Sequence, residues 1–383
     1  MKSKIVSLIL LLLVVFASCT KDGSFSSSDS AITSASGTGP GNGNQPGVIT
    51  AGEWNDLQNW NFWDSIMKKD NFKSLPAYWK FFNTHRISVS VTGTDAKPVV
   101  NAVVKLKKDG AIIFTTKTDN TGSAELWADL FQDNSTLNLS GLTIDINNGA
   151  ATISSVKSYS DGINKITISA APVTNKLELA FVVDATGSMG DELEFLKTEL
   201  LDVINRVKND NPNSAISTSS VFYRDKGDDY VTRVSNFSSN ISTTIDFIKK
   251  QSAGGGGDIP EAVHSALDKA VNELQWSATA KTRLLFLILD APPHYENSVI
   301  NNIQASIKNA AEKGIKIIPI TASGIDKETE FLMRFIAMST NGTYVFITNH
   351  SGIGNNHLEA TVGPYQVEYL NNLMVRLINK YAQ

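Results

Sequence analysis

The chain has 383 residues, a formal net charge of −4 and a single cysteine. A mildly acidic chain without basic clusters is a poor candidate for binding nucleic acid, and one cysteine cannot form an intramolecular disulfide. The length allows two folded domains with additional elements.

The first segment has the pattern of a secretory signal. Lys2 and Lys4 precede an apolar stretch over residues 5–16, which is too short to cross a bilayer comfortably, and small residues follow at 17–18. These features predict a signal peptide at residues 1–18. With Cys19 directly after it, the segment resembles a bacterial lipoprotein signal, which implies that Cys19 is lipidated. An ordinary signal peptide with an incidental cysteine is the alternative.

Residues 19–50 are rich in Ser, Gly, Asn and Thr, and this composition predicts a flexible tether. Thr20-Lys21-Asp22 resembles the export signal with which some Bacteroidota lipoproteins reach the outer face. We therefore expect a lipid-anchored protein of the bacterial cell envelope, in the outer membrane, with the cell surface as one destination.

Residues 51–85 are rich in aromatic side chains. Their spacing of three or four residues predicts helix faces packed on a neighbouring element. A surface that stacks on carbohydrate is the alternative. The aromatic residues are Trp54, Trp60, Phe62, Trp63, Phe72, Tyr78, Trp79, Phe81 and Phe82.

Residues 86–171 alternate apolar and polar side chains in short runs, separated by turn sequences such as 108–110 and 119–122. This pattern predicts a small antiparallel β-sandwich. The sequence from Pro98 to Ala102, followed by Thr118 to Gly122, resembles the transthyretin-like modules that accompany secreted carboxypeptidases. The resemblance implies a spacer or binding platform.

Residues 176–383 alternate apolar strand patterns with amphipathic helix patterns. The sequence predicts an α/β fold with a Rossmann-like, doubly wound and mostly parallel sheet covered on both faces. Ligands of such sheets bind where the carboxyl ends of the strands meet the loops. The expected strands lie at 177–183, 219–223, 284–289, 315–320 and 344–347, and the expected helices at 191–208, 259–274, 297–313 and 367–381.

Oxygen-bearing side chains follow several of these strands. Asp184, Thr186 and Ser188 come after the first, and Asp290 comes after the run at 284–289. Hard divalent cations prefer carboxylate and hydroxyl oxygens. The pattern therefore predicts a metal site at this edge of the sheet.

At these residues the chain resembles a von Willebrand factor A (VWA) domain with a metal-ion-dependent adhesion site. The resemblance implies that Asp184, Thr186 and Ser188 hold Mg²⁺ or Mn²⁺, with Asp290 completing the shell directly or through water. The sequence Asp-Ile-Pro-Glu at 258–261 resembles the loop of integrin β-subunit I-like domains, which implies that Glu261 is also a ligand.

The same resemblance implies flanking ions, including Ca²⁺. Asp225, Asp258 and the carbonyl of Pro260 would hold one, although Gly256 stands where the integrin loop has an asparagine. The spacing of Asp258 and Glu261 also fits a helix capping box.

Asp191 and Glu192 resemble the carboxylate pair that holds a third ion. They are equally typical of a helix N-terminus, where the macrodipole favours acidic side chains.

No nucleophile elbow or phosphate-cradling sequence is found, and His350 and His357 are expected to be exposed in a Gly/Asn-rich loop. We therefore expect a protein without catalytic activity. The bound ion would keep one position open for an Asp or Glu carboxylate of a protein partner, in an adhesion or assembly module. A polysaccharide-handling surface protein, with the VWA domain purely structural, is the alternative.

Overall fold

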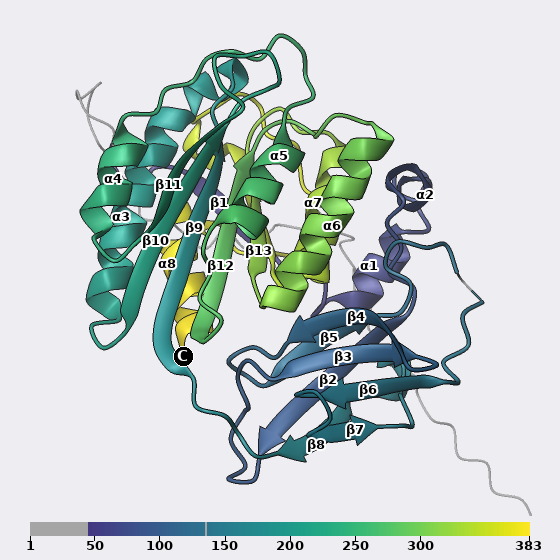
Figure 1. The fold of residues 1–383 in the computed structure, drawn as a ribbon. Helices are drawn as coiled ribbons and strands as arrows, with labels where there is room; N and C mark the ends of the chain where they lie inside the picture. The colour runs from purple at the N-terminus through teal and green to yellow at the C-terminus, as the bar shows by residue number, and fades with distance from the viewer. Residues whose placement is uncertain (1–44, 135) are drawn as a thin grey trace, which may run out of the picture. The chain divides into compact units, whose positions relative to one another are not determined.

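The computed structural model describes residues 45–134 and 136–383 (Figure 1). The predicted signal peptide, Cys19 and most of the predicted tether lie outside these residues. Within the described ranges, no helix is both long and apolar enough to cross a membrane.

An eight-stranded sheet organises the C-terminal half of the chain. Its order is β11-β10-β9-β12-β13-β14-β1-β15, and the strands from β10 to β14 run parallel. This arrangement confirms the predicted α/β fold class. The strands are β1 (Thr50–Trp54), β9 (Thr174–Asp184), β10 (Ala215–Tyr223), β11 (Thr232–Ser238), β12 (Ala280–Leu289), β13 (Lys316–Thr321), β14 (Tyr344–Ile347) and β15 (Glu368–Tyr369).

Helices cover both faces of this sheet. Along β9, Leu179 and Phe181 belong to one apolar core and Ala180 and Val182 to the other, because successive side chains of a strand point to opposite faces. Figure 1 shows α3, α4 and α8 on one face and α5, α6 and α7 on the other. These helices are α3 (Leu193–Asp210), α4 (Ile241–Lys249), α5 (Val263–Asp268), α6 (Asn297–Lys313), α7 (Lys327–Ser339) and α8 (Leu370–Ala382).

Strand β1 differs from the sequence-based expectation, which placed residues 51–85 in a helical segment apart from the sheet. It pairs antiparallel with both β14 and β15. Immediately before it, the backbone amides of Gly47, Val48 and Ile49 donate to the Glu199 carboxylate over 2.9–3.3 Å. The predicted tether, with its end at residue 50, therefore extends too far, since these residues are bound to α3.

The rest of the aromatic segment forms α1 (Trp60–Ile66) and α2 (Leu75–Trp79). Its large side chains pack on α7. Trp63 is stacked on Phe331 with ring centroids 5.8 Å apart, and Phe81 lies 4.9 Å from Phe335. Trp63, Trp79 and Phe81 are buried, so these rings are not available to stack on a carbohydrate.

Residues 86–168 form a β-sandwich of two sheets, β5-β2-β8 and β4-β3-β6-β7. β2 and β8 pair in parallel, in contrast to the purely antiparallel sandwich that was expected. The strands are β2 (Arg86–Gly93), β3 (Val103–Lys108), β4 (Ala111–Lys117), β5 (Ser123–Trp127), β6 (Leu142–Ile146), β7 (Ala151–Ile153) and β8 (Asn164–Ile168).

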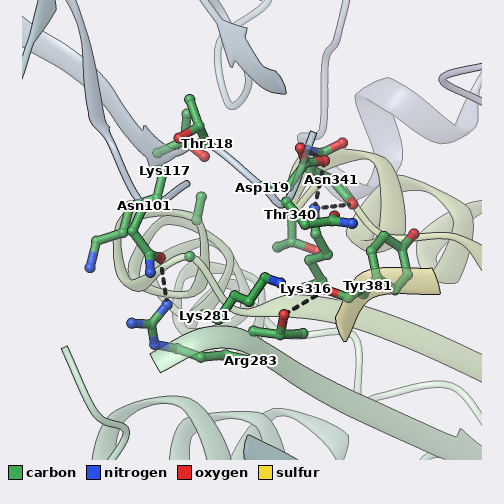
Figure 2. A pocket seen from close by; sticks show the side chains of 15 residues that line it. Asn101, Lys117, Thr118, Asp119, Lys281, Arg283, Lys316, Thr340, Asn341 and Tyr381 are labelled. Atoms are coloured by element: carbon green, nitrogen blue, oxygen red, sulfur yellow. Dashed lines mark hydrogen bonds and ion pairs between the residues drawn. The ribbon is translucent and has the colours of Figure 1, made fainter. Parts of the chain in front are cut away.

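Polar contacts join the sandwich to the large sheet (Figure 2). Asn101 donates to the Ala280 carbonyl over 2.6 Å and accepts from Arg283 Nη1 over 3.0 Å. Asp119 Oδ2 lies 3.4 Å from Lys316 Nζ at the other side of the same junction. The two parts are therefore held together through buried or half-buried hydrogen bonds.

Candidate metal centre

The loop after β9 orients its acidic and hydroxyl side chains through local hydrogen bonds. Asp184, the last residue of β9, is fully buried. Its Oδ1 accepts from the amide of Thr186 over 2.9 Å and from the hydroxyl over 2.7 Å, while its Oδ2 has no partner among the described residues. The hydroxyl oxygens of Thr186 and Ser188 lie 3.1 Å apart. One carboxylate oxygen and two hydroxyls thus gather at the strand end.

Asp290 and Glu261 come to the same edge from two other segments. Asp290 follows β12, which pairs in parallel with β9, so the ends of the two strands meet. Glu261 forms an isolated bridge with Pro293, and its amide donates to the Pro292 carbonyl over 2.9 Å. Both carboxylates are buried, and Asp290 Oδ1 and Glu261 Oε2 have no partner in the described part of the chain.

Burial and mutual repulsion make these carboxylates hard to ionise without a cation. Burial raises the pKa of Asp184 to about 6, with a further contribution from Asp225. Burial and the neighbouring Asp184 raise the pKa of Asp290 to about 7 and that of Glu261 to about 9. A divalent cation would relieve both costs, because it offsets the repulsion and supplies ligands for the unpartnered oxygens.

A glycine loop closes one side of the centre. Gly187 donates to the Gly255 carbonyl over 3.1 Å, and Gly254 donates to the Ala185 carbonyl over 3.1 Å. Gly256 has a positive φ of 72°, and a Cβ there would lie only 3.0 Å from Glu261 Oε1. The loop can approach the acidic side chains this closely because it lacks side chains.

Two residues that the sequence analysis did not identify hold this loop. Asp228 accepts from the amides of Gly256 and Asp225 over 2.9 and 3.0 Å. Arg224 donates to the carbonyls of Ala185 and Ser252 over 3.1 and 2.9 Å. The only available sequence signal was the charged turn at 224–229, which by itself does not indicate what it supports.

The residues of the predicted flanking site beside Glu261 differ in burial. Asp225 is buried, and its Oδ1 lies 2.7 Å from His294 Nε2. Asp258 is exposed and Pro260 is half-buried. The interpretation of Asp258 and Glu261 as a capping box is wrong, because α5 begins only at Val263 with Ala262 at its N-cap.

The carboxylates of Asp191 and Glu192 contact the loop at 349–358. Glu192 is buried; its Oε1 accepts from the amide of Ser323 over 3.1 Å and lies 3.0 Å from His357 Nε2, without hydrogen-bond alignment. Asp191 accepts from Asn355 over 2.8 Å. The expectation that His357 is exposed is wrong, since only 8% of it is accessible. Neither acid caps α3 through its side chain.

Among the described residues, no cluster of three or more His, Cys, Asp and Glu side chains could hold an ion by itself. Asp184, Glu261 and Asp290 therefore do not form such a cluster by themselves, and an ion at the strand ends would also need the hydroxyls of Thr186 and Ser188. This donor set, with its unpartnered buried oxygens, fits a hard divalent cation whose remaining positions are filled by water or a partner.

Comparison with known proteins places the centre within a recognised domain. Residues 178–354 match the family described as von Willebrand factor A domain. The matched span begins within β9 and ends after β14, and it contains all five residues predicted to bind the primary ion. This part of the chain is therefore similar to the VWA domain family.

Two curated relatives match parts of the chain. A putative ariadne-like RING finger protein of Acanthamoeba polyphaga mimivirus is 33% identical over 131 residues, which are 34% of this chain and 12% of that protein. The alpha-protein kinase vwkA of Dictyostelium discoideum is 26% identical over 183 residues, which are 47% of this chain and 28% of that protein. The chain therefore spans only a small part of either relative.

Three solved structures are distantly similar to parts of this chain. An aerotolerance-related membrane protein from Bacteroides fragilis is 15% identical with a TM-score of 0.34, over 53% of this chain and 99% of that one. BatB of Bacteroides thetaiotaomicron is 15% identical with a TM-score of 0.35, over 54% and 98%. The pilus adhesin SpaC of Lactobacillus rhamnosus is 14% identical with a TM-score of 0.39, over 55% and 31%.

Proposed function

We propose that this protein binds a carboxylate of a protein partner through a divalent cation held at the carboxyl ends of β9 and β12. One observation carries the proposal. Asp184, Glu261 and Asp290 each place a buried oxygen without a partner at one edge of the sheet. A buried polar atom without a partner destabilises the folded state, and an ion that binds these oxygens would remove that free-energy penalty.

The residues divide into ligands and supports. Asp184, Glu261 and Asp290, together with the hydroxyls of Thr186 and Ser188, would hold Mg²⁺ or Mn²⁺. When bound, the ion supplies a positive centre with an open position that attracts an acidic side chain. Thr186 fixes the rotamer of Asp184 through its amide and hydroxyl, and Asp228 and Arg224 fix the glycine loop.

A flanking ion such as Ca²⁺ would have fewer ligands than the sequence predicted. Asp225 already contacts His294, and Asp258 is exposed, which disfavours a second ion there. Glu192 retains one unpartnered buried oxygen and is the remaining candidate.

The proposal includes a location and a mode of action. Lipidation of Cys19 would anchor the protein in the outer membrane of a bacterial envelope, and the VWA domain would act there as an adhesion or assembly module without catalytic activity. The alternative is polysaccharide binding through the aromatic segment or the β-sandwich. Its first form is weakened because Trp63, Trp79 and Phe81 are buried against the VWA domain.

The experiment combines calorimetry with partner capture. Mg²⁺, Mn²⁺ and Ca²⁺ are titrated into the chelator-treated full chain and into the Asp184→Asn and Asp290→Asn variants. The same proteins then capture partners from envelope extracts, with Mg²⁺ or with chelator. We expect saturable ion binding that both variants lose, and partners that are recovered only with metal. Equal recovery in chelator, or ion binding unaffected by either variant, would overturn the proposal.

A further inference from the structure

A second charged site lies at the junction of the β-sandwich and the VWA domain, and it is basic. A groove of about 670 Å³ runs between β3 and β4 on one side and α6 and the segment at 272–278 on the other. Its lining includes four cationic side chains, Lys105, Lys117, Arg283 and Lys313, against a single carboxylate, Glu312. The volume is in the range of sites for small ligands.

Three of the four cations donate to neutral oxygens rather than to carboxylates. Lys105 Nζ donates to Asn148 Oδ1 over 2.7 Å, and Lys313 Nζ donates to the Val271 carbonyl over 2.7 Å. Arg283 donates through Nε to the Ser277 carbonyl over 2.7 Å and through Nη1 to Asn101. No ion pair of these four side chains occurs among the described residues, so no carboxylate there offsets their charge through direct contact.

The side chains of two of the cations, Lys117 and Arg283, pass close to Gly314. Gly314 sits beneath both, since a Cβ there would lie 3.1 Å from Lys117 Cβ and 3.4 Å from Arg283 Nη1. Arg283 is only 2% exposed, and its Nη2 has no hydrogen-bond partner. In the described part of the chain, Lys117 Nζ also makes no hydrogen bond. Figure 2 shows Asn101, Lys117 and Arg283 at one side of the junction.

The charges that face this spot agree with the geometry. Burial lowers the pKa of Lys117, and Arg283 lowers it further, while Glu312 acts in the opposite direction. Burial also lowers the pKa of Arg283, against the effect of Glu178, which is itself paired with Lys176. Here two adjacent cations repel each other in a half-buried site, as the carboxylates do at the metal centre. A bound anion would relieve this repulsion.

The remaining lining indicates which kind of anion fits. Asn148, Asn272, Gln275 and Asn309 contribute amide groups, which pair with hydroxyls as donors and acceptors. Trp276 is half-buried in the wall, with its ring edge-on to Phe237 and its Nε1 fixed by the Ala270 carbonyl. A rigid indole beside amides and cations suits a sugar ring that carries acidic groups.

We propose that this groove binds an acidic oligosaccharide, with its carboxylates or sulfates against Lys117 and Lys313 and a sugar ring against Trp276. The site is separate from the metal centre and uses none of its residues. Binding there would let the protein hold an acidic glycan and a protein partner independently.

The test is calorimetry on the full chain in chelator, so that the metal centre cannot contribute. The probe is the hexamer of α-1,4-linked galacturonic acid, and maltohexaose is the uncharged control. We expect saturable binding of the acidic hexamer, weakened about tenfold in Lys117→Gln through loss of one charge-assisted contact. Binding should also weaken as salt rises from low to moderate concentration.

Lys108→Gln is the matched control variant. Lys108 lies on β3 like Lys105 but outside the groove, and it donates to the carbonyls of Asn138 and Ser140. The affinity of the Lys108→Gln variant for the acidic hexamer should stay within twofold of that of the parent chain. Equal losses in Lys117→Gln and Lys108→Gln, or no saturable binding, would overturn the proposal. Equal or tighter binding of hexaglutamate would overturn the assignment to a glycan and indicate an acidic peptide. Because chelator is present throughout, these outcomes do not depend on the metal-dependent function.

Discussion

Two buried acidic clusters in this protein differ in how their charge is balanced. At the first, Asp56 and Glu330 surround Arg334, which is fully buried and makes contacts of 2.6 Å to Asp56 and 3.0 Å to Glu330. At the second, Asp184, Glu261 and Asp290 are buried to a similar degree, yet each has an unpartnered oxygen. The first cluster carries its own cation. The second requires one from outside.

This difference separates a structural cluster from a binding site. The proximity of Asp56 raises the pKa of Arg334 even though burial acts in the opposite direction, so the guanidinium stays charged. At the strand ends, the neighbours of Glu261 are Asp184, Asp225, Asp290 and Asp228, all of which raise its pKa. Burial alone therefore does not indicate function, whereas burial without a counter-charge does.

The largest expected effect comes from breaking the cluster that already holds its own cation. Arg334→Met leaves Asp56 and Glu330 buried without their cation and should cost about 3–5 kcal/mol of unfolding free energy. Urea unfolding in chelator and in Mg²⁺ measures this, and the increment that Mg²⁺ adds should be unchanged.

Arg376→Met is the control for that variant. Arg376 also pairs with two carboxylates, Glu53 and Glu368, but its side chain is 47% exposed. Its loss should cost less than about 1 kcal/mol. A similar cost for both variants, or a changed Mg²⁺ increment in Arg334→Met, would contradict the contrast between the clusters.

Replacing one carboxylate of the metal centre should have the opposite effect, namely a lost Mg²⁺ increment without a loss of metal-free stability. Mg²⁺ at 100 times its dissociation constant should stabilise the parent chain by about 2.7 kcal/mol through mass action. Asp184→Asn should lose this increment, and in chelator it should be at least as stable as the parent, because an unfavourably buried carboxylate is removed. Urea unfolding of both chains, with and without Mg²⁺, provides the measurement. A variant that keeps the increment would show that Asp184 is not a ligand.

A smaller effect distinguishes Glu261 from its neighbour in the same loop. Glu261→Gln should weaken Mg²⁺ binding about tenfold, which corresponds to about 1.4 kcal/mol. Asp258→Asn should change it less than twofold, because Asp258 is exposed while Glu261 is 2% exposed. Calorimetric titration of the two variants tests the assignment. If Asp258→Asn has the larger effect, the loop must rearrange when the ion binds.

Sequence periodicity was sufficient to predict the strands that position the centre. The apolar runs that became β9 and β12 end directly before Asp184 and Asp290, so local sequence gave both the strand and the ligand that follows it. Parallel pairing then brings the two ends together. The predictions for Asp184, Thr186, Ser188 and Asp290 therefore depended on local pattern plus one general property of parallel sheets, whereas that for Glu261 depended on the resemblance of its loop to integrin β-subunit I-like domains.

Long-range pairing explains what the sequence could not reveal. Strand β1 pairs with β14 across almost 300 residues, and its five residues lack apolar alternation. Glu261 has the local spacing of a capping box, but its bridge to Pro293 overrides that preference. His357 is buried because Glu192 and Asn349 lie beside it, and none of these contacts has a signal in the neighbouring sequence.

The last prediction concerns how the stability of the folded chain and the binding of Mg²⁺ depend on pH. In the metal-free folded chain, burial and neighbouring acids raise the pKa of Asp184, Asp290 and Glu261 to about 6, 7 and 9, against about 4 when unfolded. Between pH 4 and 9 the folded state therefore binds more protons than the unfolded state, so metal-free stability should fall as pH rises. The ion must displace these protons, and its binding should strengthen with pH.

We therefore expect the Mg²⁺ increment to unfolding free energy to be at least about 1.4 kcal/mol larger at pH 8 than at pH 6, because the ion displaces protons from Asp290 and Glu261, and each displaced proton contributes about 1.4 kcal/mol per pH unit while the group is protonated. Urea unfolding at the two pH values, with Mg²⁺ and with chelator, measures the difference. Equal increments at both pH values, or metal-free stability that rises from pH 6 to pH 8, would show that the acidic set is neutralised within the chain after all.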